Sequence, residues 1–206
     1  MPDPHLIRSP NTDSRPDGSV PELIVIHAIS LPPERFGGSG VEQLFTNRLD
    51  PSGHPYYAQI HTLRVSAHYF IRRTGALICF VPPELRAWHA GVSMWRGRER
   101  CNDFSIGIEL EGCDTLPFEA VQYAVLADLI ADLCVRFPIA GITGHSNIAP
   151  GRKTDPGPRF SWARLRQLLS DAGQGEVASR IEPDGWGGDD DELLMAWPFP
   201  VGARPA

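Results

Sequence analysis

Three side chains in this sequence have the types and the placement of a catalytic metal site. His27 stands near the end of the apolar run "ELIVIHAIS", and His145 follows the apolar "AGIT" in a turn that begins with glycine. Asp155 lies ten residues after His145, in a proline-rich loop that can fold back toward it. Two imidazoles and one carboxylate form a three-ligand set for zinc and leave a fourth position open for water. Spacing alone leaves one alternative open, a structured loop with a Lys–Asp pair on its surface.

The stretch "GHSNIAPGRKTDPGP" (144–158) also contains Lys153, the only lysine among 19 basic residues. The other basic residues are all arginine. Lysine carries a compact ammonium, whereas the guanidinium of arginine is a larger planar fork. The single lysine therefore suggests that position 153 requires a compact ammonium.

A buried carboxylate is the third feature that could do chemistry. In "SIGIELEG" (105–112), strand alternation puts residues 107, 109 and 111 on one face and the apolar residues 106, 108 and 110 on the other. Glu109 sits in mid-strand, where a charge is costly unless it is paired or used. The alternative is a strand face exposed to solvent.

Several elements are expected to position these side chains. We expect strands over 22–30 and 104–112, a hairpin over 66–83, and irregular segments over 50–64 and 87–103. Helices are expected over 41–49, 117–137 and 161–170. This loose alternation predicts an α/β fold in which helices pack around a central mixed β-sheet.

Length and charge suggest one domain followed by a tail. The chain has 206 residues, of which 42% are hydrophobic. We expect a domain over 1–170 and a flexible acidic tail over 171–206, because the tail holds 8 acidic and 2 basic residues among many Gly and Pro. One short apolar segment, "ELLMAWPFP", lies within the tail.

The composition also limits partners and compartment. Residues 1–170 hold 17 acidic and 17 basic residues, so no basic excess suggests a nucleic acid. The chain shows no secretory signal and no apolar run of the ~18 residues that a membrane span needs, which favours a soluble cytoplasmic protein. We expect a monomer, and the four cysteines are expected to be free thiols because none forms a Cys-x-x-Cys pair.

Longer motifs resemble a known family. The stretches "IVIHAISLPPERFGG", "HPYYAQIHTLRVSAHYFIRR", "RAWHAGVSMWRGRERCNDFSIGIELEG" and "TGHSNIAPGRKTDPGP" together are similar to the zinc N-acetylmuramoyl-L-alanine amidases. This family shares its fold with the phage T7 lysozyme and the peptidoglycan recognition proteins. The resemblance implies one Zn²⁺ per chain. It also implies hydrolysis of the amide between 1,6-anhydro-N-acetylmuramic acid and L-alanine of muropeptides during cytoplasmic cell-wall recycling.

The resemblance assigns roles by position. It makes His27, His145 and Asp155 the zinc ligands. The expected catalytic residues are Glu109 and Lys153, and the expected substrate-binding residues are Tyr56, Arg64 and Arg100. A catalytic ammonium at position 153 would also explain why the only lysine stands there. One departure is Ala28, where family members usually have asparagine after the first histidine.

Two rival functions follow from the same motifs. One is a muropeptide-binding module without catalysis, although such proteins typically lack a ligand or a catalytic residue and this chain keeps all five. The other is a lytic amidase that acts on intact peptidoglycan, which the missing export signal disfavours. Turnover of isolated anhydro-muropeptide compared with polymeric wall distinguishes the three.

Overall fold

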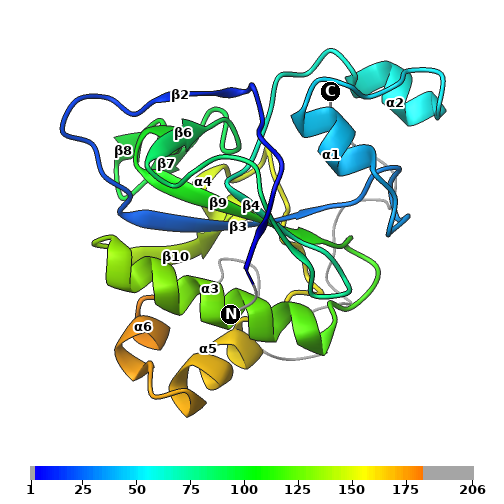
Figure 1. The fold of residues 1–206 in the computed structure, drawn as a ribbon. Helices are drawn as coiled ribbons and strands as arrows, with labels where there is room; N and C mark the ends of the chain where they lie inside the picture. Colours follow the sequence, from blue (N-terminus) through cyan, green and yellow to red (C-terminus); the bar gives the residue numbers. More distant parts are fainter. Residues whose placement is uncertain (1–2, 183–206) are drawn as a thin grey trace.

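The computed structural model describes residues 3–182, and a six-stranded sheet forms their centre (Figure 1). Its strands, in spatial order, are β1 (His5–Leu6), β5 (Leu77–Cys79), β4 (Tyr69–Ile71), β9 (Ser105–Glu111), β3 (Leu23–Ile29) and β10 (Gly141–Gly144). Only β4 and β5 pair antiparallel, and the other neighbours are parallel. The expected mixed sheet is therefore confirmed.

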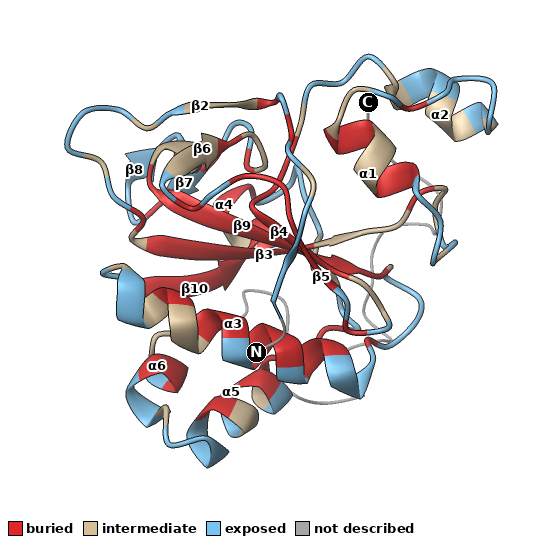
Figure 2. Cartoon of the chain, in the orientation of Figure 1, coloured by how far each residue is buried: buried red, intermediate tan, exposed pale blue. Residues whose placement is uncertain are grey.

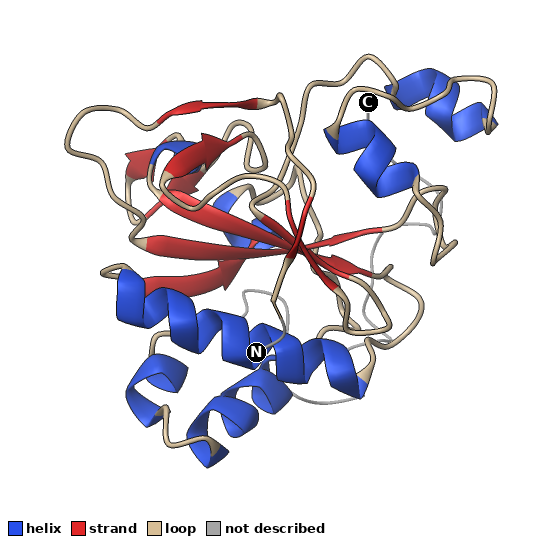
Figure 3. Cartoon of the chain, viewed as in Figure 1, coloured by secondary structure: helices blue, strands red, loops and turns tan. Residues whose placement is uncertain are grey.

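The remaining elements surround this sheet (Figure 3). Two antiparallel pairs are formed by β2 (Thr12–Ser14) with β6 (Leu85–Ala87), and by β7 (Met94–Trp95) with β8 (Arg98–Glu99). The helices are α1 (Gly40–Phe45), α2 (Pro55–Ile60), α3 (Ala120–Arg136), α4 (His145–Ile148), α5 (Trp162–Asp171) and α6 (Gly175–Ser179), and a 3₁₀ turn spans Cys101–Asp103.

The two central strands have one apolar face and one chemically active face. Ile24 and Ile26 of β3 and Ile106 and Ile108 of β9 are fully buried in a core cluster that includes the inner face of α3 (Figure 2). Burying such a side chain contributes about 1.5–3 kcal/mol. Because side chains alternate, His27 points to the opposite face. The core under α3 thus holds rigid the strands that carry the site.

Helix α3 is tied to the sheet by a buried amide. The side chain of Gln122 accepts the backbone N–H of Glu119 at 3.0 Å, and its Nε2 donates to the carbonyls of Ile71 and Glu111 at 3.2 and 3.1 Å. Pro138 lies two residues after the last helical residue, where it cannot continue the helix. The predicted helix over 117–137 is confirmed, with slightly narrower bounds.

Two segments expected to be irregular contain regular structure. Within 50–64, α2 begins at Pro55, and the Nδ1 atom of His54 caps it by accepting the N–H of Tyr56 at 3.1 Å. Proline at the first helical position and a side-chain acceptor before it are both helix-start signals. Within 87–103, the short pair β7–β8 and the 3₁₀ turn replace the expected loop.

The folded unit extends beyond the expected boundary at 170. Helix α6 follows α5, and Val177, Ala178 and Ile181 are buried in the core cluster beside α3 and α5. Ile181 also forms a β-bridge with Ile142. These apolar side chains outweigh the acidic, Gly-rich composition, so the tail was predicted to begin too early. The rest of it, 183–206 with its apolar segment, lies outside the described residues.

Two further expectations concern cysteines and membranes. All four cysteines are free, with Cys79 and Cys101 buried and Cys113 and Cys134 partly buried, as expected. Within 3–182, no helix has the length and apolarity needed to cross a membrane.

Candidate metal centre

Three side chains from separate elements converge at one point. His27 comes from β3, His145 is the first residue of α4 directly after β10, and Asp155 comes from the loop after α4. Nδ1 of His27 lies 2.9 Å from Nδ1 of His145 and 3.0 Å from Oδ2 of Asp155, and the third distance is 3.1 Å. The parallel pairing of β3 with β10 brings the two histidines together at the same edge of the sheet.

The loop that carries Asp155 is folded back by its own backbone. The N–H of Ser146 donates to the carbonyl of Asp155 at 2.9 Å, and the N–H of Lys153 donates to Ala149 at 3.1 Å. Gly144 allows the close return, because a Cβ there would lie 2.9 Å from Cδ of Pro156. The expected approach of Asp155 to His145 is confirmed.

Outer hydrogen bonds determine which imidazole nitrogen faces the centre. Nε2 of His145 lies 3.1 Å from the carbonyl oxygen of Ala90. A carbonyl only accepts, so the ring hydrogen is assigned to Nε2, and the lone pair of Nδ1 points at His27 and Asp155. On the far side of His27, Nε2 lies 2.9 Å from Nδ1 of His89.

The charge distribution suits a cation. Burial lowers the pKa of His27 to about 4, and the nearby charge of His145 adds to this effect. Burial alone would raise the pKa of Asp155, but the close contacts with His145 and His27 outweigh it and hold the pKa below its usual range. A neutral imidazole and an ionised carboxylate are the forms that bind metals. Three electron-rich atoms within 3.1 Å repel one another unless a positive charge lies between them.

Glu109 lies beside this cluster. It pairs in register with His27 across β3 and β9, and 9% of its surface is exposed. Its Oε2 has no hydrogen-bond partner among residues 3–182. Burial raises the pKa of Glu109 well above its usual range, the charge of Asp155 raises it further, and Lys153 opposes both. The alternative of a solvent-exposed strand face is wrong, because every residue of β9 is buried.

Lys153 is exposed on the loop between His145 and Asp155. Its positive charge acts on both Glu109 and His27, lowering the pKa of each. The ammonium is therefore electrostatically coupled to the site, although it forms no ion pair with a carboxylate of residues 3–182. Its neighbour Arg152 is more constrained, because its guanidinium donates to the carbonyls of Ala90 and Val92 at 2.6 Å each.

The expected substrate-binding residues are spread over two regions. Tyr56 packs against the apolar cluster that includes α1 and β4. The exposed guanidinium of Arg64 donates to the carbonyl of Thr62 at 3.1 Å, just after α2. Arg100 pairs with Asp103 at 3.1 Å and lines a hollow of about 480 Å³ beside the loop after α4. Arg100 is thereby placed beside the loop that carries Asp155, and the roles of all three stay predictions.

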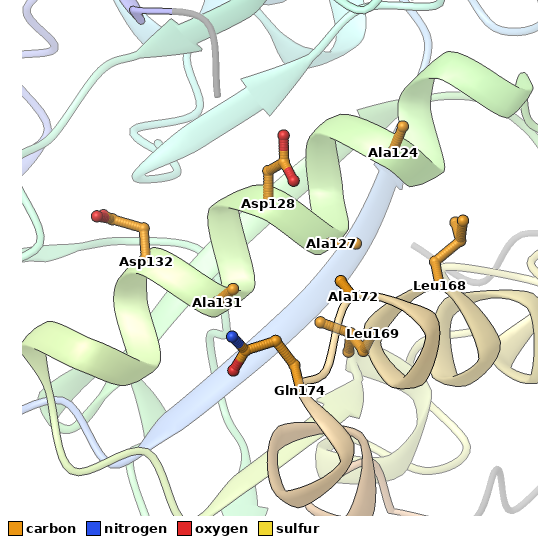
Figure 4. A pocket seen from close by; sticks show the side chains of 9 residues that line it. All are labelled: Ala124, Ala127, Asp128, Ala131, Asp132, Leu168, Leu169, Ala172 and Gln174. Carbon is orange, nitrogen blue, oxygen red and sulfur yellow. The ribbon is translucent and has the colours of Figure 1, made fainter.

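A second hollow, of about 520 Å³, lies between α3 and α5 with the turn that follows α5 (Figure 4). Ala127 and Ala131 of α3 and Leu168 of α5 form its walls, with Asp128 at its rim. None of its lining residues belongs to the metal cluster, so this hollow is separate from the candidate site.

Two residues behave differently from what the motifs suggest. Ala28 is partly buried and packs against the core under α3, on the face away from His27, so the missing asparagine leaves the cluster intact. His89 contacts His27 directly but was not singled out among the seven histidines. The signal available was its place in "RAWHAGVS", one of the quoted motifs.

Comparison with known proteins identifies the family. The family model described as N-acetylmuramoyl-L-alanine amidase matches residues 17–158. The 1,6-anhydro-N-acetylmuramyl-L-alanine amidase AmpD of Citrobacter freundii is 55% identical over 173 residues, which cover 83% of this chain and 92% of that protein.

Two solved structures extend the comparison. A crystal structure of a selenomethionine derivative of AmpD superimposes with a TM-score of 0.80 at 56% identity, covering 82% of this chain and 95% of the other. AmiD of E. coli, in complex with the substrate anhydro-N-acetylmuramic acid-L-Ala-D-γ-Glu-L-Lys, gives a TM-score of 0.53 at 31% identity and covers 75% and 60% of the two chains. The chain thus belongs to the N-acetylmuramoyl-L-alanine amidase family, and within it to the 1,6-anhydro-N-acetylmuramyl-L-alanine amidases.

Proposed function

We propose that this enzyme is a zinc-dependent amidase that releases the peptide from anhydro-muropeptides during cell-wall recycling in the cytoplasm. The observation that carries the proposal is the convergence of His27, His145 and Asp155, whose ligand atoms lie within 3.1 Å of one another beside the buried Glu109. The substrate follows from the names of the relatives at 55% identity.

The donor set fits zinc. Two imidazole nitrogens and one carboxylate oxygen are a ligand combination of catalytic zinc sites, which keep a fourth position for water or substrate. Bound there, zinc supplies Lewis-acid polarisation of the carbonyl and lowers the pKa of a water molecule toward ~7. The lone pair of Nδ1 in His145 is already directed at the centre by the hydrogen bond to Ala90.

Glu109 is suited to move the proton. In the proposed reaction the attacking water adds to the lactyl carbonyl carbon, and Glu109 accepts its proton at the carboxylate. The C–N bond then breaks, and the same carboxyl returns the proton to the nitrogen of L-alanine. A carboxyl whose pKa is raised by burial can hold that proton between the two steps.

Lys153 is suited to stabilise negative charge on the carbonyl oxygen. Its exposed ammonium acts electrostatically on His27 and Glu109 and is not held by a carboxylate among the ion pairs of residues 3–182. A positive group near the developing oxyanion lowers the barrier, because it interacts more strongly with the transition state than with the neutral amide.

The substrate would extend from this centre toward arginines. Arg100, in the hollow beside the loop after α4, is proposed to meet a peptide carboxylate, while Tyr56 and Arg64 are proposed to contribute at the rim. Arg64 would first have to release the carbonyl of Thr62. The enzyme is proposed to act as a monomer, with neither nucleic acid nor membrane as a partner.

Turnover of two substrates tests the proposal. The purified enzyme, reloaded with zinc after chelation, should hydrolyse isolated anhydro-muropeptide and leave polymeric peptidoglycan largely intact. Comparable rates on polymeric wall would support a lytic amidase instead. Binding of anhydro-muropeptide without release of peptide would support a non-catalytic binding module.

A further inference from the structure

His89 lies behind the metal centre, between His27 of β3 and Ser105 of β9. Its Nδ1 lies 2.9 Å from Nε2 of His27, and its Nε2 lies 3.1 Å from Oγ of Ser105. Since Nδ1 of His27 faces the centre, its ring hydrogen is on Nε2 and donates to His89. His89 then carries its own hydrogen on Nε2 and donates to Ser105. The chain of donors runs in one direction, from the metal ligand into the protein.

The ring of His89 packs against β9 on the face that carries Glu109. Gly107 lies between Ser105 and Glu109 on that face, and a Cβ at position 107 would collide with the ring atoms of His89. The absence of a side chain there leaves room for an imidazole to lie flat against the strand. Three alternate residues of β9 thus form one row on this face. Ser105 accepts a hydrogen bond from His89, Gly107 leaves room for its ring, and Glu109 is the buried carboxylate.

The backbone next to His89 holds the other histidine. The carbonyl of Ala90 accepts Nε2–H of His145 at 3.1 Å. The N–H groups of His89 and Ala90 both donate to Oδ1 of Asn102, at 3.1 and 2.8 Å. Two adjacent residues thus provide the outer hydrogen-bond partner of both histidines, and Asn102 fixes their position.

We propose that His89 is a positioning residue of the metal centre: it accepts the Nε2–H of His27 and thereby fixes the ring orientation that presents Nδ1 as a ligand. The inference rests on the proposed function, because it concerns the same centre. Partners of this kind orient a ligand histidine and increase its basicity, and their removal typically weakens metal affinity about 10–100-fold.

Zinc affinity, measured by competition with a chromogenic chelator, tests the proposal in four proteins. His89→Leu removes the acceptor and should weaken zinc binding about 10–100-fold. His89→Asn places an amide oxygen near the position of Nδ1 and should restore most of the affinity. His61→Leu, a partly exposed histidine far along the chain, is the control and should bind as the wild type does. Zinc affinity of His89→Leu within twofold of the wild type would overturn the role of His89.

The outcomes separate the two proposals. If the wild-type protein itself binds no zinc, the proposed function fails; if it binds zinc and His89→Leu binds equally well, only this inference fails. A measurement on the unaltered protein guards against a variant that does not fold. In its zinc-loaded form, ¹H–¹⁵N correlation of the imidazoles should show the His27 hydrogen on Nε2, with a nuclear Overhauser contact to His89. A hydrogen on Nδ1 of His27 would overturn the inference without any substitution.

Discussion

His27 and Glu109 face each other in register across the parallel strands β3 and β9, so a metal-ligand candidate and a buried carboxylate share one face of the sheet. Their backbones are fixed by the same hydrogen-bond ladder, and neither can shift along its strand without breaking that ladder. Because the backbone holds both positions, a substitution of Glu109 need not move His27. The effects on catalysis and on zinc binding can therefore be predicted separately.

The first prediction concerns Glu109. Glu109→Gln preserves shape and removes the ability to accept a proton, so the rate on anhydro-muropeptide should fall about 10²–10⁴-fold. Zinc content should stay at the wild-type level, because Glu109 is not among the three converging ligand atoms. A rate within threefold of the wild type would remove Glu109 from the proton transfer.

Lys153 provides the second prediction. Lys153→Ala should lower the rate about 10²–10³-fold, the usual loss for one oxyanion-stabilising donor. Lys153→Arg should cost at least about tenfold, because the planar guanidinium does not fit where a compact ammonium does. Zinc content should hardly change in either variant.

The control for Lys153 must be chosen with care. Arg152 is next in sequence, but its guanidinium holds the carbonyls of Ala90 and Val92, so even Arg152→Lys would disturb the segment behind His145. Arg159 is exposed and lies farther along the loop, so Arg159→Lys should leave the rate unchanged. Wild-type turnover in Lys153→Ala would mean that the lysine is isolated by accident of composition.

The third prediction concerns the chain beyond α5. A chain shortened to end at Glu182 should keep its thermal midpoint within a few degrees and its catalytic rate within a few-fold. A chain ending at Ser170 loses Val177, Ala178 and Ile181 from the core, and each buried apolar side chain removed costs roughly 1–3 kcal/mol. Its midpoint, followed by circular dichroism, should fall by well over 10 °C. Equal midpoints for the two shortened chains would contradict the placement of α6.

The fourth prediction concerns acid stability. Burial lowers the pKa of His68 to about 3, and the charge of Arg15 contributes. In the unfolded chain an ordinary histidine titrates near pH 6.5. The folded protein therefore binds fewer protons, so the contribution of His68 is complete above about pH 6.5 and is lost as the pH falls toward 3.

Denaturant unfolding of the metal-free protein between pH 7 and 4 measures this effect. One proton corresponds to a slope of about 1.4 kcal/mol per pH unit. The glutamine of His68→Gln can still accept from the N–H of Gly107 or donate to the carbonyl of Leu85. As the pH is lowered, the free energy of unfolding of this variant should decrease less steeply than that of the wild type, by up to this slope. Parallel curves for the two proteins would show that His68 does not titrate on unfolding.

Local patterns in the sequence predicted the elements that dominate the fold. The apolar run at 22–30, the alternation at 104–112 and the helical period at 117–137 correspond to β3, β9 and α3, because burial against one core imposes these periods. Helix α2 was missed although Pro55 and the cap residue His54 signalled its start. A six-residue helix offers too few turns to show a period.

The candidate site could be predicted where a polar residue stands within an apolar strand. A histidine in an apolar strand and a carboxylate within "IGIELEG" are costly to bury; His27 belongs to the cluster and Glu109 lies beside it. The partnership of His27 with His89 was not predictable, because it depends on the register of β3 against β9 and on the loop that Asn102 fixes. Neither contact leaves a local pattern.

Metal analysis of the purified protein tests the central claim most directly. Dialysed against micromolar free zinc, the wild-type chain should hold one zinc, and His145→Ala should lose most of it, because two of the three ligands cannot hold the ion tightly. Chelation should abolish turnover and zinc should restore it. Stoichiometric zinc retained by His145→Ala would contradict the assignment of His27, His145 and Asp155 as the metal centre.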